Sequence, residues 1–241
     1  KKQDRLIIEE LQNSFQNYLL LGEGARAISL IRNLINTVPS EIIYYQLIMN
    51  TVKCIQQMKI LGALKHDDYL EAYRICQEVL DSFHSAISQN RVQSDQGNAS
   101  VLVVPLLKKR DSGQLMLKLA SEAFVLSGLR ANLLENFSSD ELLHYVRTEH
   151  VRYICIVPAD DGDVREHEET FRRLKQKTNV LLTLCTDFMG ANMEKKDAFA
   201  EHIDFYGEIP ALIERISLYE KISTGIMLAD PVPSLYPDAA E

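Results

Sequence analysis

One stretch, residues 101–128, constrains the fold more than any other part of the chain. It reads VLVVPLLKKRDSGQLMLKLASEAFVLSG. An uninterrupted apolar run is followed by a short charged loop and then by leucines and alanines at helical spacing, which predicts a buried strand, a loop and a helix. This order is typical of the first unit of an open α/β sheet. In such sheets, ligands bind at the carboxyl ends of the strands.

The residues after position 100 continue the alternation of strands and helices. Ser138 and Glu141 have the spacing of a capping box at a helix start, and Pro210 suits the first turn of the last helix. Five strands that alternate with five helices predict a parallel sheet with right-handed crossovers. The predicted strands are 101–107, 130–134, 153–157, 180–185 and 203–206, and the predicted helices are 114–127, 138–150, 163–177, 195–200 and 210–222.

The first 90 residues predict a different unit, made of helices only. Apolar residues recur at helical spacing in four segments, and Gly22, Gly24, Pro39 and Gly62 separate the segments from one another. Ser40 is the expected N-cap of the third helix, and Asp67 or Asp68 that of the fourth. Short connections predict an antiparallel four-helix bundle. The domains are therefore expected at 1–90 (bundle), 91–99 (polar linker), 100–222 (α/β domain) and 223–241 (proline-containing tail).

Charge and composition exclude several classes of function. The 241 residues carry a net charge of −8 without a basic cluster, which argues against direct nucleic-acid binding by this segment. Apolar runs stay shorter than the roughly 18 residues that a membrane span needs. The four cysteines are scattered and form no CxxC pair, so we expect a cytoplasmic protein without disulfides, with Cys155 and Cys185 as buried thiols.

The chain shows no enzyme motif, and we expect no catalytic residues. The loop Arg110–Gly113 has a single glycine, whereas a dinucleotide site uses several. No serine or cysteine occupies a nucleophile elbow, and no pair of carboxylates is distinguished from surface charge. The acidic loop of Asp160, Asp161 and Asp163 could indicate a metal or phosphoacceptor site. Because the basic run 108–110 would oppose a cation there, we favour a helix cap at Asp163 and solvated neighbours, and expect no metal.

A four-helix bundle, a linker and a five-stranded parallel α/β domain resemble the cobalamin-binding modules of methionine synthase, corrinoid methyl-transfer proteins and MerR-type light or cobalamin regulators. The resemblance covers residues 10–222. Its local marks are LLGEGARA at 20–27, the turn at Gly128 and HIDFY at 202–206. It implies a helical bundle followed by a flavodoxin-like (Rossmann-type) domain, with a ligand-binding cleft between the two.

The cofactor marks of that family are missing from this chain. Counted back from Gly128, Asp111 matches the motif aspartate, whereas Gly113 stands at the cobalt-ligating histidine and Met116 at the motif glycine. Three carboxylates occupy 158–163, where the family has a serine-rich loop for the nucleotide tail. Residues 185–188, CTDF, replace a pair of glycines that allows close backbone approach.

The bundle lacks the corresponding marks as well. The sensors of the family place a tryptophan and a Glu-His pair above the corrin, and the matching positions here are Leu61, Glu71 and Ala72. The chain therefore resembles the branch that lacks the cobalt ligand, the modules of transcriptional antirepressors described as containing haem instead of cobalamin. The resemblance then implies His84, on the bundle side, as the first candidate axial ligand. Should a cofactor bind, we expect it to contact His84, Glu71, Asp111, Ser112 and Gly113.

These observations lead to one hypothesis and two alternatives. We expect a sensory module without cobalamin that acts in transcription control through protein–protein contact, with haem or another cleft ligand as an additional input. A partner would be a transcription factor or an appended DNA-binding or photosensory domain, and self-association is a further option. The alternatives are a cobalamin-dependent regulator or corrinoid-binding protein with a divergent site, and a flavodoxin-like enzyme. Tyr44, Tyr45 and Met49 could line the cleft, although core packing is favoured for them.

Overall fold

The computed structural model describes residues 2–90, 99–105, 112–135, 137–157, 168–187 and 202–223. Several predicted segments lie outside these ranges. They are most of the linker (91–98), the loops at 106–111 and 158–167, the short helix at 195–200 and the tail from 224 onwards. The proposed helix cap at Asp163 lies outside them too.

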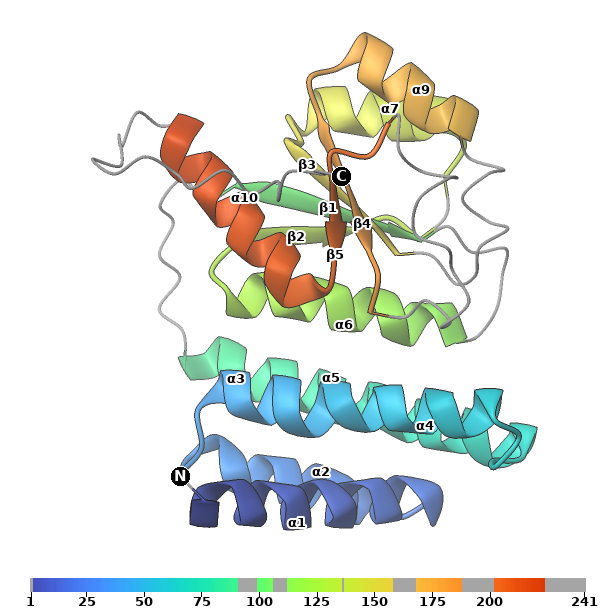
Figure 1. The fold of residues 1–241 in the computed structure, drawn as a ribbon, viewed down its shortest axis with the longest axis vertical. Helices are drawn as coiled ribbons and strands as arrows, with labels where there is room; N and C mark the ends of the chain where they lie inside the picture. The colour runs from blue at the N-terminus through green and yellow to red at the C-terminus, as the bar shows by residue number, and fades with distance from the viewer. Residues whose placement is uncertain are drawn as a thin grey trace, which may run out of the picture.

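The first 90 residues form the predicted helical bundle (Figure 1). α1 (Lys2–Leu20) and α2 (Gly24–Ile35) are followed by a third helical rod, and α5 (His66–Asn90) closes the bundle. Gly22 and Gly62 end helices with φ angles of 73° and 71°, the left-handed conformation that glycine adopts without steric cost. The two predicted chain breaks therefore have a physical basis in backbone geometry.

The third rod differs in detail from its prediction. It consists of α3 (Ser40–Ile42), a π-helical segment η1 (Ile43–Met49) and α4 (Asn50–Ile60). The predicted N-cap at Ser40 is wrong by one position, because Pro39 is the N-cap and makes no side-chain cap hydrogen bond. The predicted caps of α5 are wrong too, since the helix begins at His66 and both aspartates lie within its first turn.

The α/β domain contains the predicted five-stranded parallel sheet. Its strands are β1 (Ser100–Pro105), β2 (Arg130–Leu133), β3 (Tyr153–Val157), β4 (Leu181–Cys185) and β5 (Phe205–Gly207), in the order β2-β1-β3-β4-β5. Val103 lies opposite Leu133 on one side and Cys155 on the other. This strand order reverses between β1 and β3, as in the flavodoxin-like class of doubly wound sheets.

Helices cover both faces of the sheet. α7 (Ser139–Thr148) and α9 (Glu168–Lys177) pack on one face, and α6 (Ser112–Leu126) and α10 (Ile209–Ser223) on the other. The capping box of Ser138 and Glu141 is confirmed at the start of α7. α6 lies between the sheet and the bundle, and one hydrophobic core runs through all three layers (Figure 1). The mostly apolar sequence of α6 suits a helix that is packed on two sides.

Candidate functional site

The strand order places the candidate site at the carboxyl ends of β1, β3 and β4. Neighbouring connections leave toward opposite faces of the sheet where the order reverses, and this opens a crevice at that edge. The described residues at this edge are the strand ends Pro105, Val157 and Cys185, followed by Thr186 and Asp187. None of these five residues is a histidine.

Asp187 connects the sheet domain to the bundle at this edge. Its carboxylate is 1% exposed and forms an ion pair with Lys53 of α4. It also accepts a hydrogen bond from the N–H of Ile209 at 2.5 Å, which satisfies a free donor at the start of α10. A bundle helix therefore reaches directly to the end of β4.

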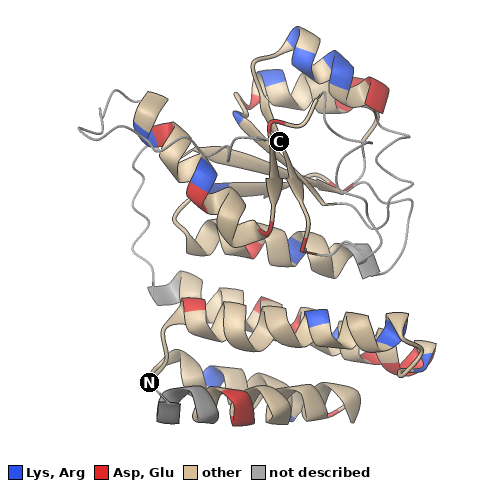
Figure 2. Ribbon diagram, in the orientation of Figure 1, with Lys and Arg blue, Asp and Glu red and all other residues tan. Residues whose placement is uncertain are grey.

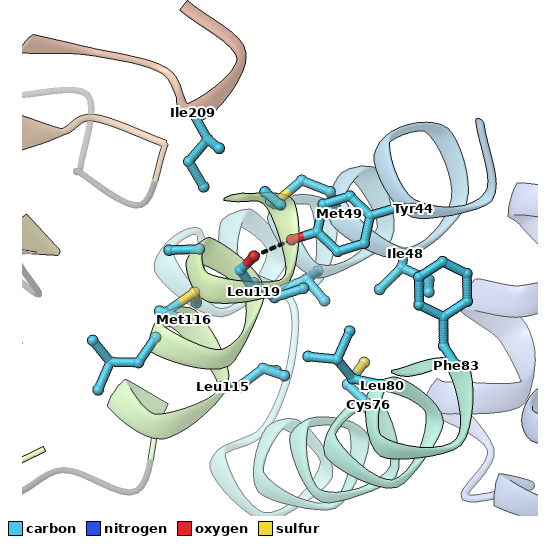
Figure 3. Packing of buried hydrophobic residues seen from close by; sticks show 14 of the residues in the cluster. Tyr44, Ile48, Met49, Cys76, Leu80, Phe83, Leu115, Met116, Leu119 and Ile209 are labelled. Carbon is cyan, nitrogen blue, oxygen red and sulfur yellow. Dashed lines mark hydrogen bonds between the residues drawn. The ribbon is translucent and has the colours of Figure 1, made fainter. Parts of the chain in front are cut away.

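Tyr44 makes a second direct connection between the two parts (Figure 3). Its side chain is fully buried, and its hydroxyl donates to the backbone carbonyl of Leu119 in α6. Burial raises the pKa of this phenol well above its usual value, so the hydroxyl keeps its proton and remains a donor. Met49 is also buried, whereas Tyr45 is half-buried against the same core. Tyr44 and Met49 are thus core residues, the interpretation that the sequence favoured.

α5 and α6 lie beside each other and run in the same direction. Successive contacts advance along both helices together, beginning near the start of α6, where the Tyr73 hydroxyl lies 3.5 Å from the Met116 sulfur. Further along, Lys118 Nζ donates to Asp81 at 3.0 Å. The contacts show that the bundle packs along the length of α6.

His84 forms the next contact in this series. Its Nδ1 lies 2.6 Å from Glu122 Oε2, and its Nε2 lies 3.3 Å from the Ser88 hydroxyl. Glu122 is almost completely buried, and its other oxygen has no hydrogen-bond partner among the described residues. Glu122 follows Ser112 by ten residues, about 15 Å along a helix, so His84 lies well away from the carboxyl edge of the sheet. Ligation by His84 stays a prediction; its ring nitrogens have protein partners in this structure.

The other predicted contact residues do not gather around His84. Glu71 is partly exposed and pairs with Arg74 at 2.6 Å, and the hydrogen bond from Arg74 lowers the pKa of its carboxyl. It precedes His84 by 13 residues on α5, about 20 Å along the helix. Ser112 and Gly113 form the start of α6, whereas Asp111 lies outside the described residues.

Sequence reasoning missed Lys53, Glu122 and Asp187. Glu122 carried a usable signal, because it is the single carboxylate in the mostly apolar helical pattern at 114–126. Lys53 and Asp187 carried none, since each is an ordinary charged residue and the two are far apart in the sequence.

Within the described residues, no group of three metal-ligating side chains comes together. The described helices include none that is long and apolar enough to cross a membrane.

Comparison with known proteins bears on the fold. No protein-family model and no curated protein sequence matches the chain. Among solved structures, the monomethylamine corrinoid protein of Methanosarcina barkeri aligns with a TM-score of 0.70 and 10% identity, over 88% of this chain and 99% of its own.

Two further structures align less closely. A methanol:cobalamin methyltransferase complex from Methanosarcina barkeri gives a TM-score of 0.42 at 12% identity, over 90% of this chain and 80% of its own. A cobalamin-binding protein from Desulfitobacterium hafniense DCB-2 gives 0.45 at 11%, over 87% and 97%. At these identities the likeness concerns the fold alone. The chain has the two-part fold of a corrinoid protein, a helical bundle on a five-stranded Rossmann-like domain.

Proposed function

We propose that this chain is a regulatory module with the fold of a corrinoid protein that works through protein–protein contact and holds no cobalt-ligated cobalamin. The observation that carries the proposal is the direct ion pair between Lys53 of the bundle and the buried Asp187 at the end of β4. A flat macrocycle between the bundle and the sheet edge would have to separate these side chains. The residues also fit such a ligand poorly, because Gly113 stands where the family has its cobalt-ligating histidine.

The direct contacts also give the module a way to transmit a signal. Asp187 binds Lys53 on one side and caps α10 on the other. A partner that shifts α4 would withdraw Lys53 and leave the Asp187 carboxylate at the first turn of α10 without its cation. The Lys53–Asp187 contact would then have two states, paired and separated, and the change between them would link the bundle to the sheet domain. The role in transcription control rests on the resemblance to antirepressor and MerR-type modules.

A second candidate function is that of a corrinoid carrier with an unusual site. It is favoured by the TM-score of 0.70, since the aligned corrinoid protein matches almost over its whole length. The two candidates differ in whether the purified protein retains a corrin: the carrier would retain it, and the regulatory module would not. A third option, haem in place of cobalamin, would be recognised by a retained Soret band.

An absorption experiment tests the proposal. The protein is incubated with hydroxocobalamin or with hemin, desalted, and its visible spectrum recorded. We expect both pigments to be removed. A retained corrin spectrum would overturn the proposal in favour of the carrier. A Soret band that persists in the wild type and in His144→Gln, an exposed control on α7, but is lost in His84→Gln would instead establish a haem site at His84.

Hydrogen exchange tests the signalling half. Lys53→Met should increase amide exchange in the first turn of α10, because Asp187 loses the cation that holds it in position. Lys175→Met provides the control, since Lys175 pairs at 2.7 Å with a different aspartate, Asp204. Unchanged exchange at the start of α10 in Lys53→Met would show that the bundle and α10 are not linked in this way.

A further inference from the structure

A basic pocket lies at the edge of the sheet opposite to the candidate site. It has a volume of about 450 Å³ and is lined by the ends of α7 and α9, by the residues that lead into β3 and β4, and by Tyr219 of α10. Pockets of this size accommodate small organic ligands. Because it lies at the amino ends of the strands, it is separate from the bundle contacts described above.

Positive charge is concentrated in this pocket although the chain as a whole is acidic, with a net charge of −8. Its lining includes Arg147, His150, Arg152 and Lys177 (the ends of α7 and α9 are shown in Figure 2). The charge of Arg152 is balanced by Glu220, whose carboxylate oxygen lies 2.9 Å from a guanidinium nitrogen of Arg152. The other three side chains form no ion pair with any carboxylate in the described part of the chain.

Helix dipoles do not cancel this charge. α7 and α9 both end at the pocket, and each C-terminus contributes about half a negative charge, roughly one in total. Arg147 and Lys177 together contribute two positive charges, and one N–H of Arg147 donates to the carbonyl of Lys177 at 3.3 Å. An excess of about one positive charge therefore remains from these two side chains, and the imidazole of His150 adds an N–H donor.

His150 has a backbone conformation that is uncommon for residues other than glycine, although histidine adopts it more often than most. Its φ is 51°, the left-handed region, at the position just after α7 where glycine is the usual residue. The N–H of Val151 bonds to the carbonyl of Val146, so the helix ends as it would with a glycine. A side chain kept at a position that disfavours it is a feature of binding sites. Here the side chain is an imidazole that lines the pocket.

We propose that this pocket binds a small phosphate monoester. Its phosphate would lie between Arg147, His150 and Lys177, because a guanidinium fork, an ammonium and an imidazole N–H all donate to phosphate oxygens. The excess positive charge suits a group that carries up to two negative charges. The ring of Tyr219, partly exposed at the pocket and packed edge-on against Tyr153, offers a flat surface for the organic part.

To test the proposal, the whole chain is titrated with adenosine monophosphate at low salt. Amide NMR shifts and calorimetry monitor the binding. We expect shifts at residues 147–153 and 177–181. Lys177→Gln should weaken binding by about tenfold, the size of one charge-assisted hydrogen bond. Arg172→Gln removes the same charge from the same helix, but Arg172 pairs with Glu169 and does not line the pocket, so affinity should stay within about twofold.

The outcomes separate the parts of the proposal. His150→Gly should bind less tightly while it keeps the fold, because glycine is at ease at this φ. Equal loss in Lys177→Gln and Arg172→Gln, or absence of shifts around the pocket, would overturn the site. Citrate that binds as tightly as the monoester would overturn the phosphate class. Inorganic phosphate that binds as tightly would overturn the role of Tyr219.

Discussion

Replacement of Lys53 by methionine should destabilise the protein, because it leaves the buried Asp187 carboxylate without its cation. Removal of one partner from a fully buried ion pair costs about 3–5 kcal/mol. Two features reduce this cost here. Lys53 is 30% exposed, so water already screens the pair in part, and the carboxylate keeps the N–H of Ile209 at a helix N-terminus. We therefore expect a loss of about 2 kcal/mol in the free energy of unfolding.

A double-mutant cycle isolates the contact between the two side chains. Asp187→Asn keeps an acceptor for the Ile209 N–H but removes the charge, and the Lys53→Met/Asp187→Asn double variant should lose less than the sum of the single losses. We expect a coupling of about 1–2 kcal/mol, measured by equilibrium urea unfolding with circular dichroism. The matched control is the more exposed pair of Lys175 and Asp204, for which a coupling below about 1 kcal/mol is expected.

Additive losses, within about 0.5 kcal/mol, would refute this reasoning. They would mean that Lys53 and Asp187 do not meet in solution, so the bundle would not lie against the end of β4. The proposal of a module without cobalamin would then lose the contact on which it rests.

Three further results are expected. In the native protein at pH 8, Ellman's reagent should react with the exposed Cys54 and spare the buried thiols. Burial raises the pKa of Cys76 and Cys155 to about 12, so only about one molecule in ten thousand carries the thiolate at pH 8. Rapid reaction of all four cysteines would contradict this. Since these folded-state pKa values lie above the unfolded value of about 8.5, the associated stability is complete below that pH and declines toward pH 12; a urea midpoint that stays constant from pH 9 to 11 would disagree. Ser138→Ala should cost about 1 kcal/mol in urea unfolding through loss of the capping box, and a cost below about 0.3 kcal/mol would count against it.

The bounds of the strongly apolar strands were predictable from the sequence, and those of short, partly exposed strands were less so. β3 begins and ends where the sequence predicted, at Tyr153 and Val157, because all of its side chains are buried and the apolar run stops with the strand. β5 is displaced from its predicted range of 203–206 to Phe205–Gly207. It is a short edge strand with partly exposed side chains, so Ile203 was as good a strand start as Phe205. The π segment η1 was not predictable either, since its residues are apolar on nearly all sides.

The candidate site was less predictable than the fold. Periodicity identifies which face of a helix is buried, but it does not identify which distant side chain will meet it. Glu71 matched the glutamate of the family's Glu-His pair, and it lies on a partly exposed face of α5, paired with Arg74. In the sequence, Asp187 was noted only as part of the segment 185–188 that replaces a pair of glycines. In the structure it binds Lys53 of the bundle and the first N–H of α10. Contacts between oppositely charged residues far apart in sequence arise from the tertiary packing, which leaves no local pattern.

The contacts along α6 set a limit on ligand binding between the bundle and the sheet. If the bundle lifted to admit a flat cofactor, Glu122 would lose His84 and Asp187 would lose Lys53. At the value of about 2 kcal/mol expected above for Asp187 without Lys53, this one contact already opposes the opening, before the hydrogen bond of Glu122 or any apolar surface is counted. A cofactor would have to offset this contact with about thirtyfold of its intrinsic affinity. A protein partner that binds the closed form meets no such cost, and for that reason we connect the direct contacts with a role in protein–protein regulation.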